Sequence, residues 1–196
     1  SFDLDASTPP RDHEPLLEDG EGEYRRYRRT EDGVSPLAFP GMEGVTVKAN
    51  SYAHDERGFT TEKAEEIRAL QEKLLRKAGS LKAELGGYQT VKTYGAPDAE
   101  KTIICWGSQK WVCIEAAAGV GARVVQPVVL APFPAEAWSK AMAGAGEVVC
   151  VENNATGQVA RLLREHGFDP GRSILKYDGR PFAVDELTAR LEEVFV

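Results

Sequence analysis

The chain has 196 residues and a net charge of −7, with 42% apolar and 28% charged residues. This mix is typical of a soluble globular protein, and the acidic excess argues against a nucleic-acid surface and against binding to an anionic membrane. No run approaches the ~18 consecutive apolar residues of a membrane-spanning helix, so no membrane partner is expected.

The start of the chain and its cysteines bear on where the protein works. Ser1 to Asp5 contain neither a basic segment nor an apolar run, so no signal peptide is predicted. The chain does not begin with Met, which is consistent with a fragment, a processed product or a trimmed chain. Cys105, Cys113 and Cys150 lie in apolar runs without a C-x-x-C pair. We therefore expect reduced, buried thiols in a cytoplasmic protein, and no iron–sulfur site held by this chain alone.

Residues 1–60 are predicted to form an irregular arm. Turn-forming sequences punctuate it closely, among them Pro9-Pro10, Glu31-Asp32-Gly33 and Pro40-Gly41. Its apolar residues are sparse and follow no long period. Because so long a stretch without regular structure is unusual inside a compact domain, we expect the arm to wrap a neighbouring surface, from another domain or another subunit.

A long connecting helix is predicted over residues 61–87. The segment is rich in Glu, Lys, Arg, Leu and Ala, with Thr60 or Thr61 expected to cap it and Gly86-Gly87 expected to end it. Apolar residues at near-helical spacing form one stripe, made up of Ile67, Leu70, Leu74, Leu75, Ala78, Leu81 and Leu85. This stripe predicts packing on a partner surface.

Strands and helices alternate regularly from Thr102 onward. We expect strands over residues 102–106, 123–130, 147–151 and 173–177. The helices expected between and after them cover residues 110–119, 135–143, 156–166 and 184–196. Such alternation predicts an α/β fold with a mainly parallel sheet, in a domain spanning residues 88–196.

The segment from Glu152 to Gln158 is the best candidate for a ligand site. It follows the third expected strand and opens the third of these helices, and ligands bind at the carboxyl ends of strands in open α/β sheets. A helix N-terminus also offers N–H groups that suit a phosphate or carboxylate. The simpler interpretation, that Asn154 or Thr156 only caps the helix, is favoured. If these side chains contact a ligand, we expect polar orientation or anion contact from Asn153, Asn154, Thr156 and Gln158, without proton transfer.

Two further motifs allow a functional interpretation. Gly107 and Ser108 follow the first expected strand and could form a second anion site, although a tight turn with a Ser cap is favoured. In His54-Asp55-Glu56, Asp55 could orient His54 as a general base. No second histidine stands at metal-ligand spacing. We predict neither a metal site nor a catalytic residue, and keep His54 as a candidate for substrate or cofactor contact.

Basic residues at two places could meet partners. The run from Arg25 to Arg29 could bind an acidic partner, although a solvated charge run is favoured. Arg180 follows Asp178-Gly179 in a predicted turn, where it could form an ion pair between subunits or lie at the surface.

An ordered set of phrases along the chain resembles a known family. The first are TEDGVSP at residues 30–36, FPG at 39–41 and NSYAHDERGFTTE at 50–62. WGS at 106–108, PFP at 132–134, ENNATGQ at 152–158 and KYDGRPF at 176–182 follow. Together they resemble the C-terminal half of the α subunit of 2-oxoacid:ferredoxin oxidoreductases, over about residues 20–190. The TEDG-x-SP-x-x-FPG and HDE-x-G segments look like the 2-oxoglutarate branch.

This resemblance implies an enzyme that decarboxylates a 2-oxoacid on thiamine diphosphate, passes electrons through iron–sulfur clusters to ferredoxin and releases an acyl-CoA. It implies that the arm leads out of a preceding pyrimidine-binding domain, absent here, which carries the activating glutamate. Residues 88–196 would then form a domain like the C-terminal domain of transketolase.

The resemblance also implies which groups and partners to expect. No cofactor is expected on this chain alone, whereas thiamine diphosphate, magnesium and iron–sulfur clusters are expected in the whole complex, where the β subunit holds the diphosphate through magnesium. Expected partners are the β subunit, possible γ and δ subunits, ferredoxin through the complex, and a second α subunit.

Three hypotheses of different classes remain. In the first, the chain is an oxidoreductase segment that serves assembly, shapes the active-site crevice and is inactive alone. In the second, it is a free-standing module that binds a small anion or nucleotide at its helix N-termini, which titration with phosphate ligands would reveal. In the third, it is a structural interaction domain that self-associates without a ligand site.

Overall fold

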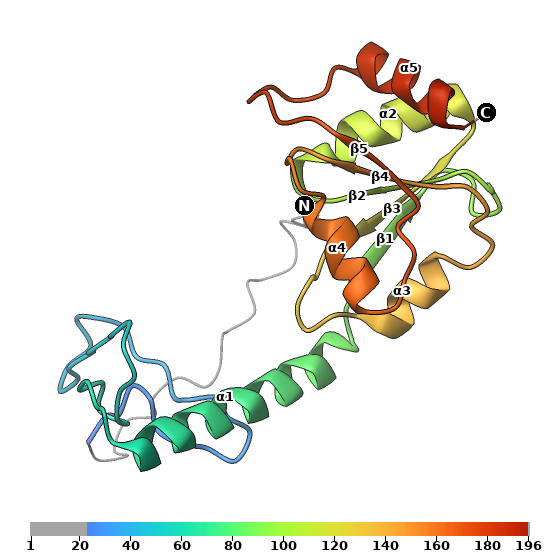
Figure 1. Ribbon diagram of the computed structural model, residues 1–196. Coiled ribbons are helices and arrows are strands. Elements are labelled where there is room, and N and C mark those ends of the chain that lie inside the picture. The colour runs from blue at the N-terminus through green and yellow to red at the C-terminus, as the bar shows by residue number, and fades with distance from the viewer. Residues whose placement is uncertain (1–22, 196) are drawn as a thin grey trace. The chain divides into compact units, whose positions relative to one another are not determined.

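The computed structural model describes residues 23–195, and the chain divides into two units (Figure 1). We call Phe2–Gly86 the arm–helix unit and Gly87–Val196 the sheet unit. The first 22 residues of the expected arm lie outside the described residues. Between residues 23 and 195, no helix is long and apolar enough to cross a membrane.

Five strands form the sheet of the sheet unit, in the order β1-β3-β2-β4-β5. They are β1 (Val91–Tyr94), β2 (Thr102–Cys105), β3 (Arg123–Pro127), β4 (Val148–Glu152) and β5 (Arg172–Leu175). β1 pairs antiparallel with β3, and the pairs β2–β3, β2–β4 and β4–β5 are parallel. The predicted α/β fold with a mainly parallel sheet is thus confirmed.

The central strands are buried on both faces, as parallel strands between two helix layers usually are. Ile103 and Val151 belong to the core on one face, whereas Ile104 and Cys150 belong to the core on the other. Because successive side chains of a strand point to opposite faces, a continuous apolar run encodes each of these strands. β-branched residues dominate the runs, which favours extended backbone.

Two helices cover each face of the sheet (Figure 1). α2 (Lys110–Val120) and α5 (Val184–Val194) pack on one face, and α3 (Ala135–Ala141) and α4 (Gln158–Glu165) on the other. Leu187 and Leu191 of α5 anchor the first core, and Trp138 of α3 and Leu163 of α4 anchor the second. A short 3-10 helix, η1 (Gly107–Gln109), precedes α2.

The elements of the sheet unit differ from the sequence prediction in one strand and at several ends. β1 is not predicted from the sequence. β3 ends at Pro127 rather than at residue 130. The N–H of Val128 still donates to the Thr90 carbonyl in the β1–β3 register, at 2.9 Å. The N–H of Val129 donates to the same carbonyl, at 3.2 Å, so the regular pairing ends there.

α1 (Ala64–Leu85) is the long helix of the arm–helix unit. It begins after Lys63 and ends at Gly86, as the sequence predicts for its end. The expected threonine cap is wrong, because no side chain among residues 23–195 caps α1 and the Thr61 hydroxyl accepts the Lys63 N–H at 3.2 Å instead.

The arm contacts α1 at definite points although it has little regular structure. A Cβ at Gly33, where φ is +81°, would lie 2.5 Å from the Lys77 nitrogen, so the two backbones nearly touch. Ser80 donates its hydroxyl to the Asp32 carbonyl at 2.7 Å, and an isolated bridge pairs His54 with Thr60. The surface that the arm covers is therefore, at least in part, the helix of its own chain.

Candidate functional site

The carboxyl ends of β2, β4 and β5 meet at one edge of the sheet, because these strands are parallel. β2 leads through η1 into α2 on one face, whereas β4 leads into α4 on the opposite face. Two neighbouring strands whose helices diverge in this way mark the switch point where open α/β sheets bind ligands. This geometry makes the loops after β2 and β4 the first place to look for a site.

The N-terminus of α4 is occupied by a carboxylate of the chain itself. Glu152 is fully buried at the end of β4, and its Oε2 and Oε1 accept the N–H groups of Val159 and Ala160 at 2.9 and 3.1 Å. Asn154 donates its amide to Oε2 at 2.8 Å. The Glu152 carboxylate therefore takes the place at the positive end of the helix dipole. The sequence suggested that these N–H groups would bind a phosphate or carboxylate of a ligand, but in the structure they bind Glu152.

Asn154 completes the cap. Its Oδ1 accepts the N–H groups of Thr156 and Gln158 at 3.1 and 3.3 Å. Gly157 precedes the helix with a φ of +61°, so α4 begins at Gln158 rather than at the expected Thr156. Of the two residues proposed as caps, Asn154 fills this role, as expected of a side chain that satisfies free N–H groups at a helix start.

The other three candidates at this edge lie at the surface. Asn153 donates its amide to the carbonyls of Lys176 and Arg180, both at 3.3 Å, and so joins the loops that follow β4 and β5. Thr156 and Gln158 are exposed, and neither side chain hydrogen-bonds within residues 23–195. Any contact with a ligand at this edge would therefore be made by exposed side chains, and that contact stays a prediction.

Gly107 and Ser108 form the tight turn that the sequence favours. They lie in η1, where Gly107 has a φ of +58°. The expected Ser cap is wrong, since the Ser108 hydroxyl does not cap α2 but accepts the side-chain amide of Gln109 at 3.2 Å. A second anion site at this turn stays a prediction.

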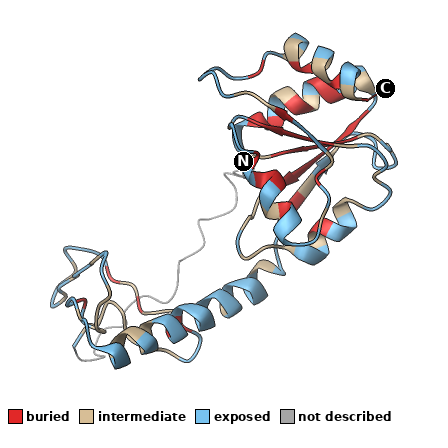
Figure 2. Cartoon of the chain, in the orientation of Figure 1, coloured by how far each residue is buried: buried red, intermediate tan, exposed pale blue. Residues whose placement is uncertain are grey.

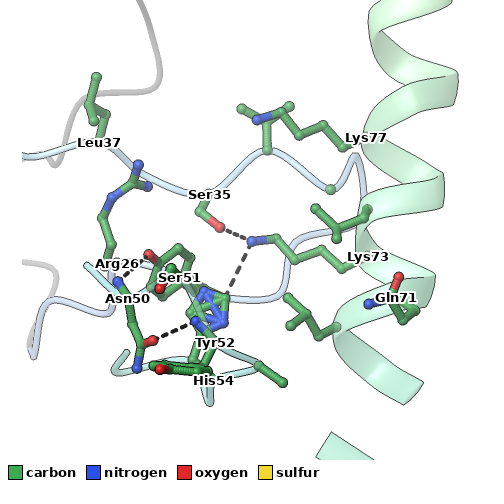
Figure 3. A pocket seen from close by; sticks show the side chains of 16 residues that line it. Arg26, Ser35, Leu37, Asn50, Ser51, Tyr52, His54, Gln71, Lys73 and Lys77 are labelled. Carbon is green, nitrogen blue, oxygen red and sulfur yellow. Dashed lines mark hydrogen bonds between the residues drawn. The ribbon is translucent and has the colours of Figure 1, made fainter. Parts of the chain in front are cut away.

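His54 lies in the arm–helix unit, where it lines a cavity (Figure 3). Tyr27 also lines this cavity. The two rings meet edge to face with centroids 3.6 Å apart. His54 Nδ1 is buried and has no hydrogen-bond partner among the described residues. Burial lowers the pKa of His54; the charge of Asp55 opposes this shift, and that of Lys73 adds to it.

Asp55 does not orient His54 as a general base would require. Its Oδ1 accepts the N–H groups of Arg57 and Phe59, both at 2.9 Å, and closes the turn that carries them. Burial acts to raise the pKa of Asp55, but these backbone N–H bonds lower it below its ordinary value. The suggested His–Asp acid/base pair is therefore not formed in this structure.

The cysteines are structural. Cys105, Cys113 and Cys150 are unpaired and buried, as predicted. A hydrogen bond with Cys113 and burial raise the pKa of Cys105, and burial and the charge of Glu152 raise the pKa of Cys150. Neutral thiols are poor metal ligands, and within the described part of the chain no three His, Cys, Asp or Glu side chains gather as a metal site would need.

The run from Arg25 to Arg29 takes part in packing within the arm–helix unit. Arg25 pairs with Glu56 at 3.3 Å, and Arg29 pairs with Glu66 of α1. The backbone N–H of Arg29 also donates to Glu56, at 2.6 Å. These contacts mean that part of the run is neither freely solvated nor available to an acidic partner.

The chain is similar in sequence to α subunits of 2-oxoacid:ferredoxin oxidoreductases. It is 32% identical over 198 residues to a protein of Aeropyrum pernix named 2-oxoacid:ferredoxin oxidoreductase 2, subunit alpha, covering 98% of this chain and 30% of that protein. It is 34% identical over 182 residues to 2-oxoacid:ferredoxin oxidoreductase 1, subunit alpha, of Sulfurisphaera tokodaii, covering 91% and 29%. No protein-family profile matches the chain.

A solved structure supports the same relationship. The 2-oxoglutarate:ferredoxin oxidoreductase from Magnetococcus marinus, with 2-oxoglutarate, coenzyme A and succinyl-CoA bound, matches with a TM-score of 0.70 and 27% identity. The match covers 92% of this chain and 32% of that one. The chain thus spans about 30% of the length of the relatives it matches, a smaller share than the half expected from the sequence.

Proposed function

Because this chain is a homologue of a segment of 2-oxoacid:ferredoxin oxidoreductase α subunits, we propose that it works as part of such an enzyme. The enzyme would convert a 2-oxoacid and CoA to acyl-CoA and CO2 while reducing ferredoxin. The segment itself would serve assembly and shape the crevice in which the reaction takes place. Its similarity to α subunits over nearly its whole length is the observation that carries this proposal.

The 2-oxoglutarate branch is the proposed substrate class. The structural neighbour with the TM-score of 0.70 is a 2-oxoglutarate enzyme, which supports this choice. The TEDG-x-SP-x-x-FPG and HDE-x-G phrases of the arm point the same way.

Exposed apolar side chains support a role in assembly. Six of them lie in the described part of the arm–helix unit, namely Phe39, Tyr52, Phe59, Leu74, Leu75 and Leu81. Three of these belong to the predicted stripe of α1, where Leu75 is 73% exposed. Large apolar side chains gathered on so small a unit favour contact with other parts of an assembly. A β subunit, possible γ and δ subunits and a second α subunit are the proposed partners.

The residues of the sheet edge support a role in shaping a crevice. Asn153, Thr156 and Gln158 present polar side chains beside the carboxyl ends of β4 and β5. They can orient a ligand or contact an anion, but none is a proton-transfer group at neutral pH. Residues that only position a ligand are consistent with a chain that is inactive alone.

The donor groups of this chain do not fit the cofactors of the proposed enzyme. Its three thiols are buried, and the pKa values of Cys105 and Cys150 are raised, unlike those of the thiolates that hold iron–sulfur clusters. Carboxylates do not cluster among residues 23–195 as a magnesium site requires. Thiamine diphosphate, magnesium and iron–sulfur clusters are therefore proposed for other parts of the complex. The unpaired cysteines support a cytoplasmic location.

The proposal is tested by isolating the native protein that carries this sequence, with everything bound to it. We expect an α subunit about three times as long as this chain, since the chain spans 30% of the Aeropyrum pernix subunit. The complex should contain thiamine diphosphate and iron and should reduce ferredoxin when given 2-oxoglutarate and CoA. The matched control is the purified 196-residue chain with the same additions, which should show no activity. A native subunit of 21.4 kDa without partners or cofactors would contradict the proposal.

A further inference from the structure

The arm–helix unit contains a cavity of about 560 Å³ between the arm and α1. Its walls come from two arm segments, around Arg26–Leu37 and Asn50–His54, and from the helix between Leu70 and Lys77. Figure 3 shows Lys73 and Lys77 extending from α1 into this space. The volume is within the range of small-molecule sites.

The charge of the cavity wall has one sign. Arg26, Lys73 and Lys77 line it, and among residues 23–195 no Asp or Glu does. The chain as a whole carries 31 acidic and 24 basic residues, so three cations without a carboxylate in the described part of one wall run against its composition. Among the described residues, none of the three pairs with a carboxylate. A concave surface of one sign favours a ligand of the opposite sign.

Lys73 is the central cation of the wall. Its side chain is 5% exposed, and its Nζ donates to the Tyr27 carbonyl at 3.4 Å and to the Ser35 hydroxyl. Burial lowers its pKa, the neighbouring charges of Lys77 and Arg26 lower it further, and the charge of Glu56 opposes them. A buried ammonium that forms no direct ion pair is costly, and an anion in the cavity would remove much of that cost.

Neutral donors and apolar groups complete the lining. Asn50, Ser51 and Gln71 offer amide and hydroxyl groups, whereas Leu37, Leu70 and Leu74 form apolar patches. Mixed walls with a few convergent polar groups are typical of sites for organic ligands.

We propose that this cavity binds a small organic anion, through Arg26, Lys73 and Lys77. The ligand carries at least two acidic groups, of the phosphate or the carboxylate type, because three cations face one space. This inference is independent of the proposed function and concerns the arm–helix unit alone.

The test is isothermal titration calorimetry of the full 196-residue chain at low ionic strength. Pyrophosphate is the ligand in one experiment and 2-oxoglutarate in a second. We expect saturable binding of at least one probe, weakened by added salt. Binding of pyrophosphate alone assigns the phosphate type, and binding of 2-oxoglutarate alone assigns the carboxylate type. Saturation by neither probe at millimolar concentration would overturn the proposal.

Substitutions locate the site. Lys77→Gln and Arg26→Gln should each weaken binding about tenfold or more, as expected for the loss of a hydrogen bond to a charged group. Lys82→Gln is the matched control, since Lys82 is exposed on the same helix and does not line the cavity. Lys73→Met should abolish binding, but Lys73 also ties the arm to α1, so the other two variants decide. Equal affinity in Lys77→Gln, Arg26→Gln and Lys82→Gln would place the bound anion elsewhere and refute the assignment.

Discussion

The sheet unit and the arm–helix unit bury their residues in different ways (Figure 2). Among the described residues, every buried apolar residue except Pro36 and Ala38 lies in the sheet unit. In the arm–helix unit the buried residue of α1 is a lysine, Lys73. The difference teaches that the sheet unit has a hydrophobic core of its own, whereas the arm–helix unit relies on polar contacts and on whatever covers its exposed apolar side chains.

The polar contacts of the arm–helix unit are individually weak. Its ion pairs, such as Arg57 with Glu23 at 2.8 Å and Arg25 with Glu56 at 3.3 Å, involve partly exposed side chains. Pairs of this kind contribute about 0–1 kcal/mol each. The free energy that holds the arm on α1 is therefore small compared with that of a packed core, and a partner surface or a ligand would add to it.

Core truncation should give the largest difference between the units. Leu187 is fully buried against the sheet, whereas Leu75 of α1 is 73% exposed. Leu187→Ala should lower the free energy of unfolding by about 2–5 kcal/mol, and Leu75→Ala should change it by no more than about 0.5 kcal/mol. Urea denaturation followed by circular dichroism measures both. Similar losses in the two variants would show that α1 is covered in the isolated chain.

Removing the negative charge of Glu152 should have the next largest effect. Glu152→Gln keeps the shape but sets an amide group against the N–H groups of Val159 and Ala160. The expected loss of unfolding free energy is about 3 kcal/mol, because bonds to a buried charged group are lost and donors are left unsatisfied. Glu193→Gln, on exposed α5 surface, serves as the control and should be neutral. An unchanged urea midpoint in Glu152→Gln would refute the capping role.

A methyl group at Gly33 should separate the arm from α1 without touching the sheet unit. Its Cβ would lie 2.5 Å from backbone of α1, in a left-handed conformation that disfavours alanine. We expect Gly33→Ala to lower the local opening free energy of the arm by about 1–2 kcal/mol. Hydrogen exchange of the Asp55 N–H, bonded to the Phe59 carbonyl at 2.9 Å, reports it.

Gly79→Ala is the matched control on the same helix. Beyond the adjacent residues and the nearby backbone of α1, no described heavy atom lies within 4 Å of a Cβ at Gly79, so this change should stabilise α1 slightly, by about 0.5–1 kcal/mol. If both alanine variants leave the exchange of the arm unchanged, the close approach of Gly33 is not what holds it.

The smallest expected effect is a pH dependence confined to the arm–helix unit. Because the pKa of folded His54 lies below its ordinary value of 6.5, the unfolded state binds the proton first as pH falls. Stability of this unit should therefore fall as pH drops below 6.5 toward the pKa of folded His54. Hydrogen exchange of arm amides, measured across this pH range, should become faster as pH falls, relative to the intrinsic rate, in the wild type. In His54→Gln this pH dependence should disappear. An equal slope in both would show that His54 does not cause it.

The sequence predicts the sheet unit well because strands buried on both faces are rich in apolar residues. Apolar residues in sequence encode β2 and β4, and paired valines mark β3, whereas Gly and Pro punctuate the helices between them. β1 is missed because Val91 is its only buried residue, and the pattern Val-Lys-Thr-Tyr carries no apolar run. Its position as an antiparallel neighbour of β3 depends on pairing that local sequence does not specify.

The candidate site is predicted in part. The capping role of Asn154 follows from its place before a helix, whereas that of Glu152 is missed. The role of Glu152 could have been predicted from its position, because it is the acidic last residue of an apolar strand just before a helix, and helix N-termini attract anions. Lys73 left no signal, because a lysine in a charged helix is expected to be exposed. Its burial depends on arm residues that are distant in sequence, namely Ser35, 38 positions away, and Tyr27, 46 positions away.

Glu152 stabilises the start of α4 without help from the exposed side chains at the edge of the sheet. Since the fold supplies its own anion to α4, substitutions of the exposed Thr156 and Gln158, whose side chains make no hydrogen bond within residues 23–195, should leave the start of the helix intact. A change of Glu152 to glycine would do the reverse, leaving a carboxylate-shaped vacancy that acetate or formate from solution could fill, as in chemical rescue.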